Sequence, residues 1–247
     1  MEKEPFNTKK SFILVVLLFV IVGMSVGVGI YLSDYYHADY DAMQAFDIEQ
    51  NYTVESPKEN VTTYVPEQAI AGMIFYPGGK VEHTAYQPLM ELCASKGILS
   101  VLVEMPFRLA VFAVNAAEGI QELFPEVETW YIGGHSLGGS MAAAYVAEHV
   151  NEYEGLILLG SYSTADLSKS GLEVLSVYGS NDEVLNREKY DENKSNLSVD
   201  FVEYVIEGGC HAYFGVYGTQ EGDGVPTISV VEQITITANM ILEFVQA

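Results

Sequence analysis

Three polar residues far apart in the sequence are of the types needed for nucleophilic catalysis: Ser136, Asp182 and His211. A serine hydroxyl is a poor nucleophile at neutral pH until a base removes its proton. A histidine can take that proton and later return it to the leaving group, and a carboxylate can orient the imidazole and stabilise its charged form. Together these residues predict acyl transfer through a covalent intermediate on Ser136.

The serine lies in the run Gly134-His135-Ser136-Leu137-Gly138-Gly139, between an apolar strand predicted over residues 129–133 and a helix predicted over 137–150. This is the pattern of a nucleophile elbow, G-x-S-x-G, in which a tight turn lifts the serine hydroxyl above the sheet. Glycines flank the serine because bulky side chains would collide with the neighbouring strand and helix. His135 points away from the serine hydroxyl and is interpreted as structural.

The candidate acid and base both follow predicted strands. Asp182 ends the turn 179–182 after a strand over 172–178, and His211 ends the turn 207–211 after a strand over 201–206. Ligands bind at the carboxyl ends of the strands in such sheets, so the serine, acid and base are expected at one edge. Asp166 is a rival acid, but Asp166-Leu167-Ser168 has the form of a cap, so Asp182 is preferred.

Acyl transfer also needs N–H donors for the oxyanion that forms during attack. The first is the backbone N–H of Leu137, and the second is expected from the glycine-rich loop after a strand over 72–76, at Gly79. The side chains expected to contact substrate are Lys80, Met105, Phe107 and Tyr213. For Met105 and Phe107 an ordinary core position is an equal alternative, and Tyr213 belongs to an aromatic, glycine-rich segment expected to wall the site.

Strands and helices alternate along most of the chain. Strands are predicted over 53–55, 61–65, 72–76, 98–103, 129–133, 156–160, 172–178 and 201–206, and helices over 85–96, 111–124, 137–150 and 228–245. Strands this apolar are buried on both faces, which predicts a mostly parallel, doubly wound sheet in a three-layer αβα sandwich. The short connection between residues 160 and 172 leaves no room for a cap domain.

An uncharged, apolar segment lies near the N-terminus. It runs from Phe12 to Leu32, which is long enough to cross a bilayer as a helix. We therefore predict a cytoplasmic segment 1–11, a transmembrane anchor 12–32, a juxtamembrane linker 33–52 and a domain 53–247. Lys9 and Lys10 before the anchor place the N-terminus in the cytoplasm and the domain outside the cell. A cleaved signal peptide followed by secretion is the alternative.

The charge and the cysteine and histidine content exclude several function classes. Eleven basic and 34 acidic residues give a net charge of −23, so nucleic acid, whose phosphates would be repelled, is not an expected partner. The five histidines are scattered and no C-x-x-C occurs, so neither a metal site nor a cofactor is predicted. Cys93 and Cys210 are expected to be free thiols. The oligomeric state stays open.

Taken together, the motifs resemble the α/β-hydrolase superfamily. More narrowly, the chain is similar to the small, capless, often membrane-anchored bacterial group called alpha/beta hydrolase fold-5, which has dienelactone-hydrolase-like relatives. The motifs that carry the resemblance are residues 75–81, 105–107, 133–139, 178–182 and 207–215. The resemblance implies a serine hydrolase that uses Ser136, Asp182 and His211. Cys210 departs from the pattern, which implies asparagine there.

The leading hypothesis is a membrane-tethered serine hydrolase that acts on small-molecule carboxylic esters. A thioesterase or peptidase would use the same residues, and the fold does not choose among these substrates. An alternative from another class is a catalytically silent, tethered binding protein on a hydrolase fold. The intact set of serine, acid and base argues against that alternative.

Overall fold

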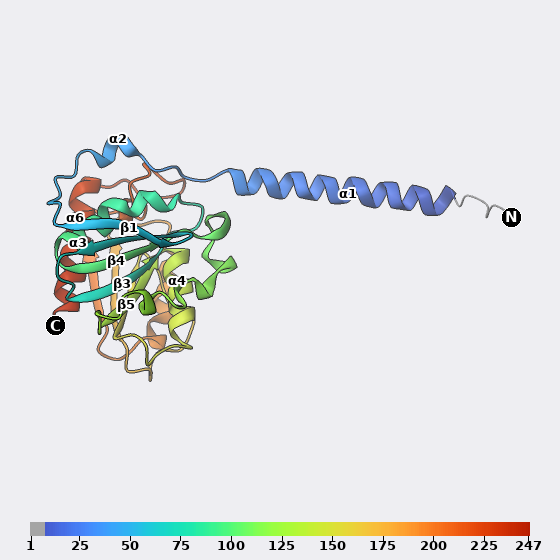
Figure 1. Ribbon diagram of the computed structural model, residues 1–247. Helices are drawn as coiled ribbons and strands as arrows, with labels where there is room; N and C mark the ends of the chain where they lie inside the picture. The colour runs from blue at the N-terminus through green and yellow to red at the C-terminus, as the bar shows by residue number, and fades with distance from the viewer. Residues whose placement is uncertain (1–7) are drawn as a thin grey trace. The chain divides into compact units, whose positions relative to one another are not determined.

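A computed structural model describes residues 8–247, which fall into two units, one ending at Tyr35 and one spanning Tyr36–Ala247. The first unit contains the helix α1, Thr8–Ser33 (Figure 1). Within it, Val16–Ser33 is long and apolar enough to cross a bilayer, a property that signal sequences share. Residues 1–7 of the predicted cytoplasmic segment 1–11 lie outside the described residues.

Within residues 8–247, the second unit is built on one eight-stranded sheet with the order β1-β2-β4-β3-β5-β6-β7-β8. The strands are β1 (Tyr52–Lys58), β2 (Val61–Pro66), β3 (Ala71–Tyr76), β4 (Ile98–Val103), β5 (Trp130–His135), β6 (Gly155–Leu159), β7 (Glu173–Gly179) and β8 (Val202–Ile206). β2 pairs antiparallel with β1 and with β4, and every other pairing is parallel. The predicted, mostly parallel sheet is confirmed.

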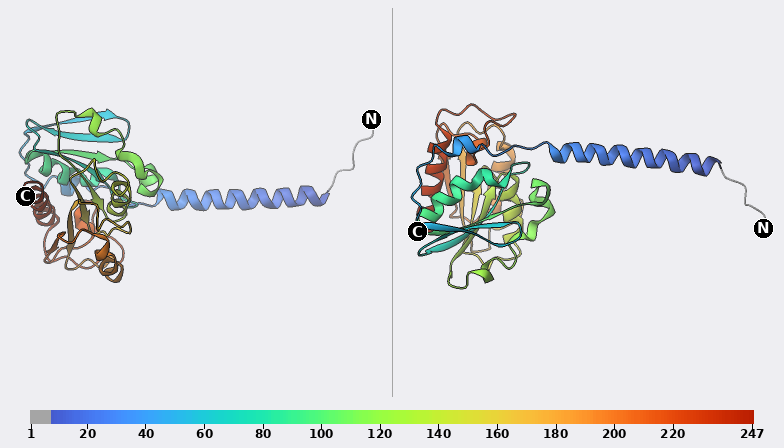
Figure 2. Two further views of the ribbon diagram at one scale, coloured as in Figure 1. Left: turned by 90° about the horizontal axis from the view of Figure 1, so that it is seen from below. Right: turned by 45° about the horizontal axis from the view of Figure 1, so that its top comes forward.

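Helices cover both faces of the sheet. α3 (Gln87–Ser95) and α6 (Val230–Val245) pack side by side on one face, and α4 (Leu137–Val146) covers the other (Figures 1 and 2). Successive strand residues supply the two cores: Phe75 packs with the α3 and α6 side, and Ile74 with the α4 side. The predicted three-layer sandwich is therefore confirmed. Its strands β3 to β7 are buried on both faces, whereas the edge strands β1 and β8 are mostly exposed.

Several element boundaries differ from those predicted. β1 continues through Pro57, a 3-10 turn (His83–Tyr86) precedes α3, and α4 ends at Val146 instead of 150. Two short helices were not predicted: α2 (Tyr40–Met43) and α5 (Arg187–Asn193). The α5 sequence, REKYDEN, has little apolar periodicity, and its helix is instead started by Asn186, whose side chain accepts a hydrogen bond from the N–H of Lys189.

The helix predicted over 111–124 was wrong. This segment forms three short 3-10 turns, Ala110–Phe112, Val114–Ala117 and Gln121–Leu123. The hydroxyl of buried Tyr76, on β3, donates to the carbonyl of Val114 and accepts from the N–H of Ala117, each at 2.8 Å. The side chain thereby takes two backbone groups that an α-helix would pair elsewhere, the Val114 carbonyl with the N–H of Glu118 and the Ala117 N–H with the carbonyl of Ala113. The local sequence could not reveal this contact.

The second unit, which we call the compact unit, begins at Tyr36, well before the predicted domain start at residue 53. The N–H groups of Tyr36 and Asp39 donate to the carbonyls of Lys80 and Val216, each at 2.8 Å. The Tyr36 ring also packs against Tyr217, with 5.6 Å between ring centroids. Most of the predicted linker 33–52 is thus part of the domain, because its backbone hydrogen bonds are satisfied by domain loops.

Replacing Tyr76 with phenylalanine should lower the free energy of unfolding by about 2 kcal/mol, because two buried backbone groups would lose their partner. Urea unfolding of the full chain in detergent, followed by circular dichroism, measures this difference. Tyr204→Phe, which changes a partly exposed tyrosine on β8, is the matched control and should stay within about 0.5 kcal/mol of wild type. Equal stabilities of the Tyr76→Phe chain and the wild type would contradict this account of residues 111–124.

Candidate active site

Ser136 occupies the single residue between β5 and α4. Its backbone has φ 53° and ψ −123°, a combination that is strained for a residue other than glycine and that a nucleophile elbow requires. The Ser136 N–H donates to the carbonyl of Leu159 at 2.9 Å, and its carbonyl accepts from the Ser161 hydroxyl at 2.7 Å. Both backbone groups are therefore held by β6 and the residues after it, which fixes the position of the serine.

Gly138 allows the start of α4 to lie directly beside the end of β3. A Cβ atom added at Gly138 would collide with the carbonyl oxygens of Tyr76 and Pro77. Backbone atoms cannot move aside in the way that a flexible side chain can, so a larger residue would displace the helix. Glycine is thus required at position 138, two residues after the serine, by this close approach of helix and strand.

His211 and Asp182 form a buried hydrogen-bonded pair. Nδ1 of His211 lies 2.8 Å from Oδ2 of Asp182, and the two side chains are 2% and 0% exposed. The other carboxylate oxygen accepts from the N–H groups of Val184 and Leu185, at 3.0 and 2.8 Å. Since the carboxylate holds Nδ1–H, the lone pair of the imidazole is on Nε2, which is buried and has no hydrogen-bond partner within residues 8–247.

The pair lies over Gly160, the residue after β6. Gly160 has φ +51°, and an added Cβ would lie 2.9 Å from Nδ1 of His211. A side chain at this position would push the imidazole away from the carboxylate. The rival acid, Asp166, is exposed and accepts hydrogen bonds from the backbone and hydroxyl of Ser168, at 3.0 and 2.6 Å. It therefore forms a local turn and does not contact His211.

Asp223, which sequence analysis missed, ties the loop of His211 to the loop of Asp182. Its carboxylate accepts from the N–H groups of His211 and Ala212, at 3.1 and 2.8 Å, and from that of Glu183 at 3.4 Å. A carboxylate that accepts several amide hydrogen bonds stabilises the turn that supplies them. Because Asp223 lies in a long irregular segment, its spacing carried no signal of this role.

Gln233, from α6, holds the residue before the histidine. Its amide accepts from the N–H of Cys210 at 2.9 Å and donates to the carbonyl of Cys210 at 2.8 Å. The Cys210 thiol has its pKa raised to about 12, chiefly by burial and secondly by the charge of Asp223, so it stays protonated. Burial likewise raises the pKa of Cys93 to about 12, and both cysteines are free, as expected.

Ser136 and His211 line one cavity of about 250 Å³. The other residues of its wall are Leu137, Ser140, Gly160, Ser161, Tyr162, Val184, Leu185 and Asn186. Sequence analysis missed Tyr162 and Asn186. Tyr162 comes shortly after β6, at the same carboxyl edge as Ser136, so the rule that ligands bind at strand ends would have found it.

The four side chains expected to contact substrate do not line this cavity. Met105 is buried in the core on the α4 side, and Phe107 is 58% exposed to solvent. Tyr213 lines a separate cavity of about 140 Å³ beside Cys210. The backbone of Lys80 has φ 59° and pairs with two neighbouring loops. The direction of each side chain depends on backbone angles that residue type alone does not reveal.

The two residues expected to supply the oxyanion donors lie next to each other. A Cβ added at Gly79 would be 2.9 Å from Cδ2 of Leu137, so the glycine-rich loop approaches the start of α4 closely. The preceding Gly78 donates its N–H to the hydroxyl of Tyr86 at 3.0 Å, and this hydroxyl lies 2.7 Å from Nδ1 of His135. Tyr86 and His135 therefore hold the loop that carries Gly79.

His135 is fully buried behind the catalytic candidates, with 4.5 Å between its ring centroid and that of His211. Burial, and secondly the nearby His211, hold the pKa of His135 well below its ordinary value. The ring is therefore neutral, and its interpretation as a structural residue fits these contacts. Within residues 8–247 no group of three or more histidine, cysteine or acidic side chains could hold a metal ion.

His135 should make the protein less stable at low pH. The unfolded chain binds a proton near pH 6.5 that the folded chain does not, so the free energy of unfolding falls as the pH drops below that value. Between pH 7.5 and 5.5 the wild type should lose about 1 kcal/mol more than His135→Gln, as measured by urea unfolding. The difference in the free energy of unfolding between the wild type and His135→Gln at pH 8 serves as the reference, because the histidine is neutral there in both the folded and the unfolded chain. Parallel pH curves would contradict a depressed pKa.

Comparison with known proteins identifies the family. A profile described as the alpha/beta hydrolase family matches residues 72–235, more than half of the chain. No protein of curated function gives a significant sequence match. Among solved structures, a dienelactone hydrolase from Anabaena variabilis is similar at a TM-score of 0.54 and 14% identity, over 81% of this chain and 98% of that one.

Two further solved structures have the same fold. A predicted CIB-like hydrolase from Thermoplasma acidophilum has a TM-score of 0.54 and 14% identity, over 80% of this chain and 100% of that one. TT1662 from Thermus thermophilus has a TM-score of 0.58 and 13% identity, over 79% and 99% of the two chains. The matched profile begins in β3 and ends in α6, so it includes the elbow and both turns of the candidate site. The chain therefore belongs to the alpha/beta hydrolase family.

Proposed function

We propose that the compact unit is a serine hydrolase that cleaves carboxylic esters through an acyl-enzyme on Ser136. The observation that carries this proposal is the buried pair of Asp182 and His211, whose imidazole lines the same cavity as Ser136. An elbow serine beside an imidazole with an unpaired Nε2 is the arrangement that nucleophilic acyl transfer needs.

In the proposed reaction, Nε2 of His211 takes the proton of Ser136 Oγ as that oxygen attacks the ester carbonyl carbon. Asp182 stabilises the imidazolium that forms. The N–H groups of Leu137 and Gly79 donate to the oxyanion until it collapses, which breaks the bond to the alkoxide. His211 protonates the leaving alkoxide, which departs as the alcohol. It then deprotonates a water that attacks the acyl carbon, and it returns this proton to Ser136 Oγ as the bond to the serine breaks and the acid leaves.

The substrate is proposed to be an ester because one similar structure is a dienelactone hydrolase, and a lactone is a cyclic ester. A thioester or a peptide bond would be attacked by the same groups, and a silent binding protein would need none of them. Leu137, Val184 and Leu185 give the cavity an apolar wall, whereas Ser140, Ser161 and Asn186 give it a polar one. A small ester with one apolar and one polar substituent suits such a cavity.

We further propose that α1 is retained as a single-pass anchor in the cell membrane, with the hydrolase outside the cell. The helix is continuous over Thr8–Ser33 and includes a span long enough for a bilayer. Lys9 and Lys10 precede the apolar segment and Asp34 follows it, which favours a cytoplasmic N-terminus. Secretion after cleavage is the alternative, and it would leave the same catalytic unit.

A fluorophosphonate probe should label the full chain, because it phosphonylates a serine that is activated by a neighbouring base. Ser136→Ala should abolish the labelling, measured by in-gel fluorescence, whereas Ser168→Ala, which changes an exposed serine, should leave it intact. Folded wild-type protein that takes up no label would favour the silent binding protein over the hydrolase.

The two rival acids provide a matched pair of variants. Asp182→Asn should reduce kcat for a p-nitrophenyl ester by about 10⁴-fold, because the amide no longer holds the imidazole in the required tautomer. Asp166→Asn removes a carboxylate that only accepts from Ser168, and its kcat should remain at the wild-type value. Equal rates in the two variants would exclude Asp182 as the orienting acid.

A further inference from the structure

The loop after β4 carries an exposed apolar cluster. We call residues 105–112 the apolar loop; within it Phe107, Val111 and Phe112 are 58%, 47% and 61% exposed. The two phenylalanine rings meet edge to face, with 5.8 Å between their centroids. The loop contains one arginine and no acidic residue, although the whole chain has a net charge of −23. Contiguous apolar surface of this kind marks an interaction site.

The apolar loop has a well-defined backbone. Phe107 and Arg108 adopt φ values of 53° and 59°, which are uncommon for residues other than glycine and persist only where the surrounding structure imposes them. The loop is fixed in the core at Met105 and at Ala110, which are 3% and 0% exposed. A defined backbone therefore holds the aromatic rings in solvent. The strain of the two positive φ values is not offset by burial of these rings, because they are exposed.

Lys80 connects the apolar loop to the N-terminal end of the compact unit. Its N–H donates to the carbonyl of Arg108, and its carbonyl accepts from the N–H of Tyr36, each at 2.8 Å. Arg108 and Tyr36 are thus hydrogen-bonded to the same residue, so their backbones lie close together. Lys80 directly follows Gly79, so the proposed oxyanion loop lies at the same place.

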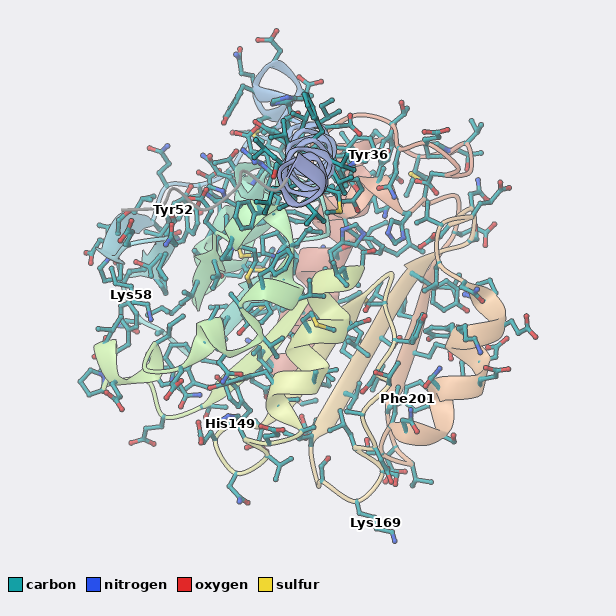
Figure 3. All side chains as sticks on the ribbon, turned by 90° about the vertical axis from the view of Figure 1, so that its right-hand side faces the viewer. Tyr36, Tyr52, Lys58, His149, Lys169 and Phe201 are labelled. Carbon is teal, nitrogen blue, oxygen red and sulfur yellow. The ribbon has the colours of Figure 1, made fainter. Side chains whose placement is uncertain are left out.

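The chain itself brings this part of the domain close to a bilayer that α1 spans. α1 ends at Ser33, and three residues on, at Tyr36, the chain is already paired with the domain. Three extended residues reach at most about 11 Å. The covalent chain therefore keeps Tyr36, which is paired with Lys80, within this reach of the last residue of α1, whatever the orientation of the two units. Figure 3 shows Tyr36 at the top of the compact unit and Phe201 in its lower half.

The negative charge of the domain disfavours membrane contact through its acidic surfaces more than contact through the apolar loop. The whole chain has 34 acidic residues, so anionic lipid headgroups repel most of the surface of the domain. The apolar loop has no acidic side chain of its own, although Glu104 directly precedes it. Aromatic and basic residues are the ones that favour the interface between headgroups and acyl chains.

We propose that the apolar loop inserts into the outer leaflet of the bilayer that anchors α1, and that the enzyme hydrolyses esters of amphiphilic molecules resident in that leaflet. This inference rests on the proposed function and on retention of α1. A cavity of about 250 Å³ accommodates only the reacting part of such a molecule, so its apolar remainder stays in the bilayer. Insertion buries the side chains of Phe107, Val111 and Phe112, which are exposed in the free protein.

Insertion is tested with the full chain reconstituted in phosphatidylcholine vesicles, with and without brominated acyl chains, which quench nearby tryptophan. The native Trp130 is 4% exposed and provides a constant background. Phe112→Trp should be quenched at least twofold, whereas Val199→Trp, 93% exposed before β8, should match the wild type. Equal quenching of the two variants, or loss of the chain from carbonate-washed vesicles, overturns the inference. The emission of Phe112→Trp could instead shift with protein concentration and show no quenching. That result would mean that the loop contacts a second copy of the chain, and it would also overturn the inference.

The substrate class is tested with a double variant, Val111→Ser with Phe112→Ser, and Val199→Ser as the matched control. For p-nitrophenyl palmitate embedded in vesicles, kcat/KM of the double variant should fall about tenfold, because apolar area that binds the bilayer is lost. For water-soluble p-nitrophenyl acetate both variants should equal the wild type. Equal losses on both esters overturn the inference while leaving the proposed function intact. A wild type inactive on both esters overturns the proposed function, and the quenching measurement then decides insertion alone.

Discussion

The hydrogen bond between His211 and Asp182 is the interaction on which the rest of the site depends. Removing two ionisable side chains from water is costly, and their mutual attraction offsets this only when their remaining polar atoms are also satisfied. The fold supplies those partners as backbone amides: Val184 and Leu185 donate to the carboxylate of Asp182. The remaining atom, Nε2 of His211, has no partner in the described residues, and it is the atom that the proposed mechanism uses.

The order of strands brings these groups together. β5, β6, β7 and β8 are consecutive neighbours in one parallel sheet, so the turns after them share one edge. Ser136 follows β5, Gly160 follows β6, and the turns of Asp182 and His211 follow β7 and β8. Gly160, between the serine and the pair, has no side chain to keep them apart. Asp223 and Gln233 then attach the histidine turn to its surroundings.

The first residues of the compact unit have a role that their composition conceals. The segment after α1 is polar and aromatic, like a linker, yet Tyr36 forms a parallel bridge with Val81 and packs against Tyr217. Because Val81 lies two residues after Gly79, the chain enters the domain beside the glycine-rich loop of the site. The same loop is paired on its other side with Arg108. The entry point of the chain, the glycine-rich loop and the apolar loop thus form one continuous region.

Patterns spanning only a few residues predicted most of the fold. The eight strands, the glycines around Ser136 and the positions of Asp182 and His211 after strand ends are all encoded by near neighbours, so they could be predicted without tertiary contacts. Boundaries were less accurate where a cap or a proline, such as Asn186 or Pro57, acts against the local preference.

The sequence by itself therefore determined the fold class, the elbow and the strand-end positions of the acid and the base. Only the tertiary structure decided that Asn186 lines the cavity, whereas Met105 turns into the core. It also decided that Tyr76 holds residues 114–117 away from a helix and that Asp223 braces the histidine turn. These outcomes depend on partners more than ten residues away, and neither periodicity nor residue type encodes such contacts.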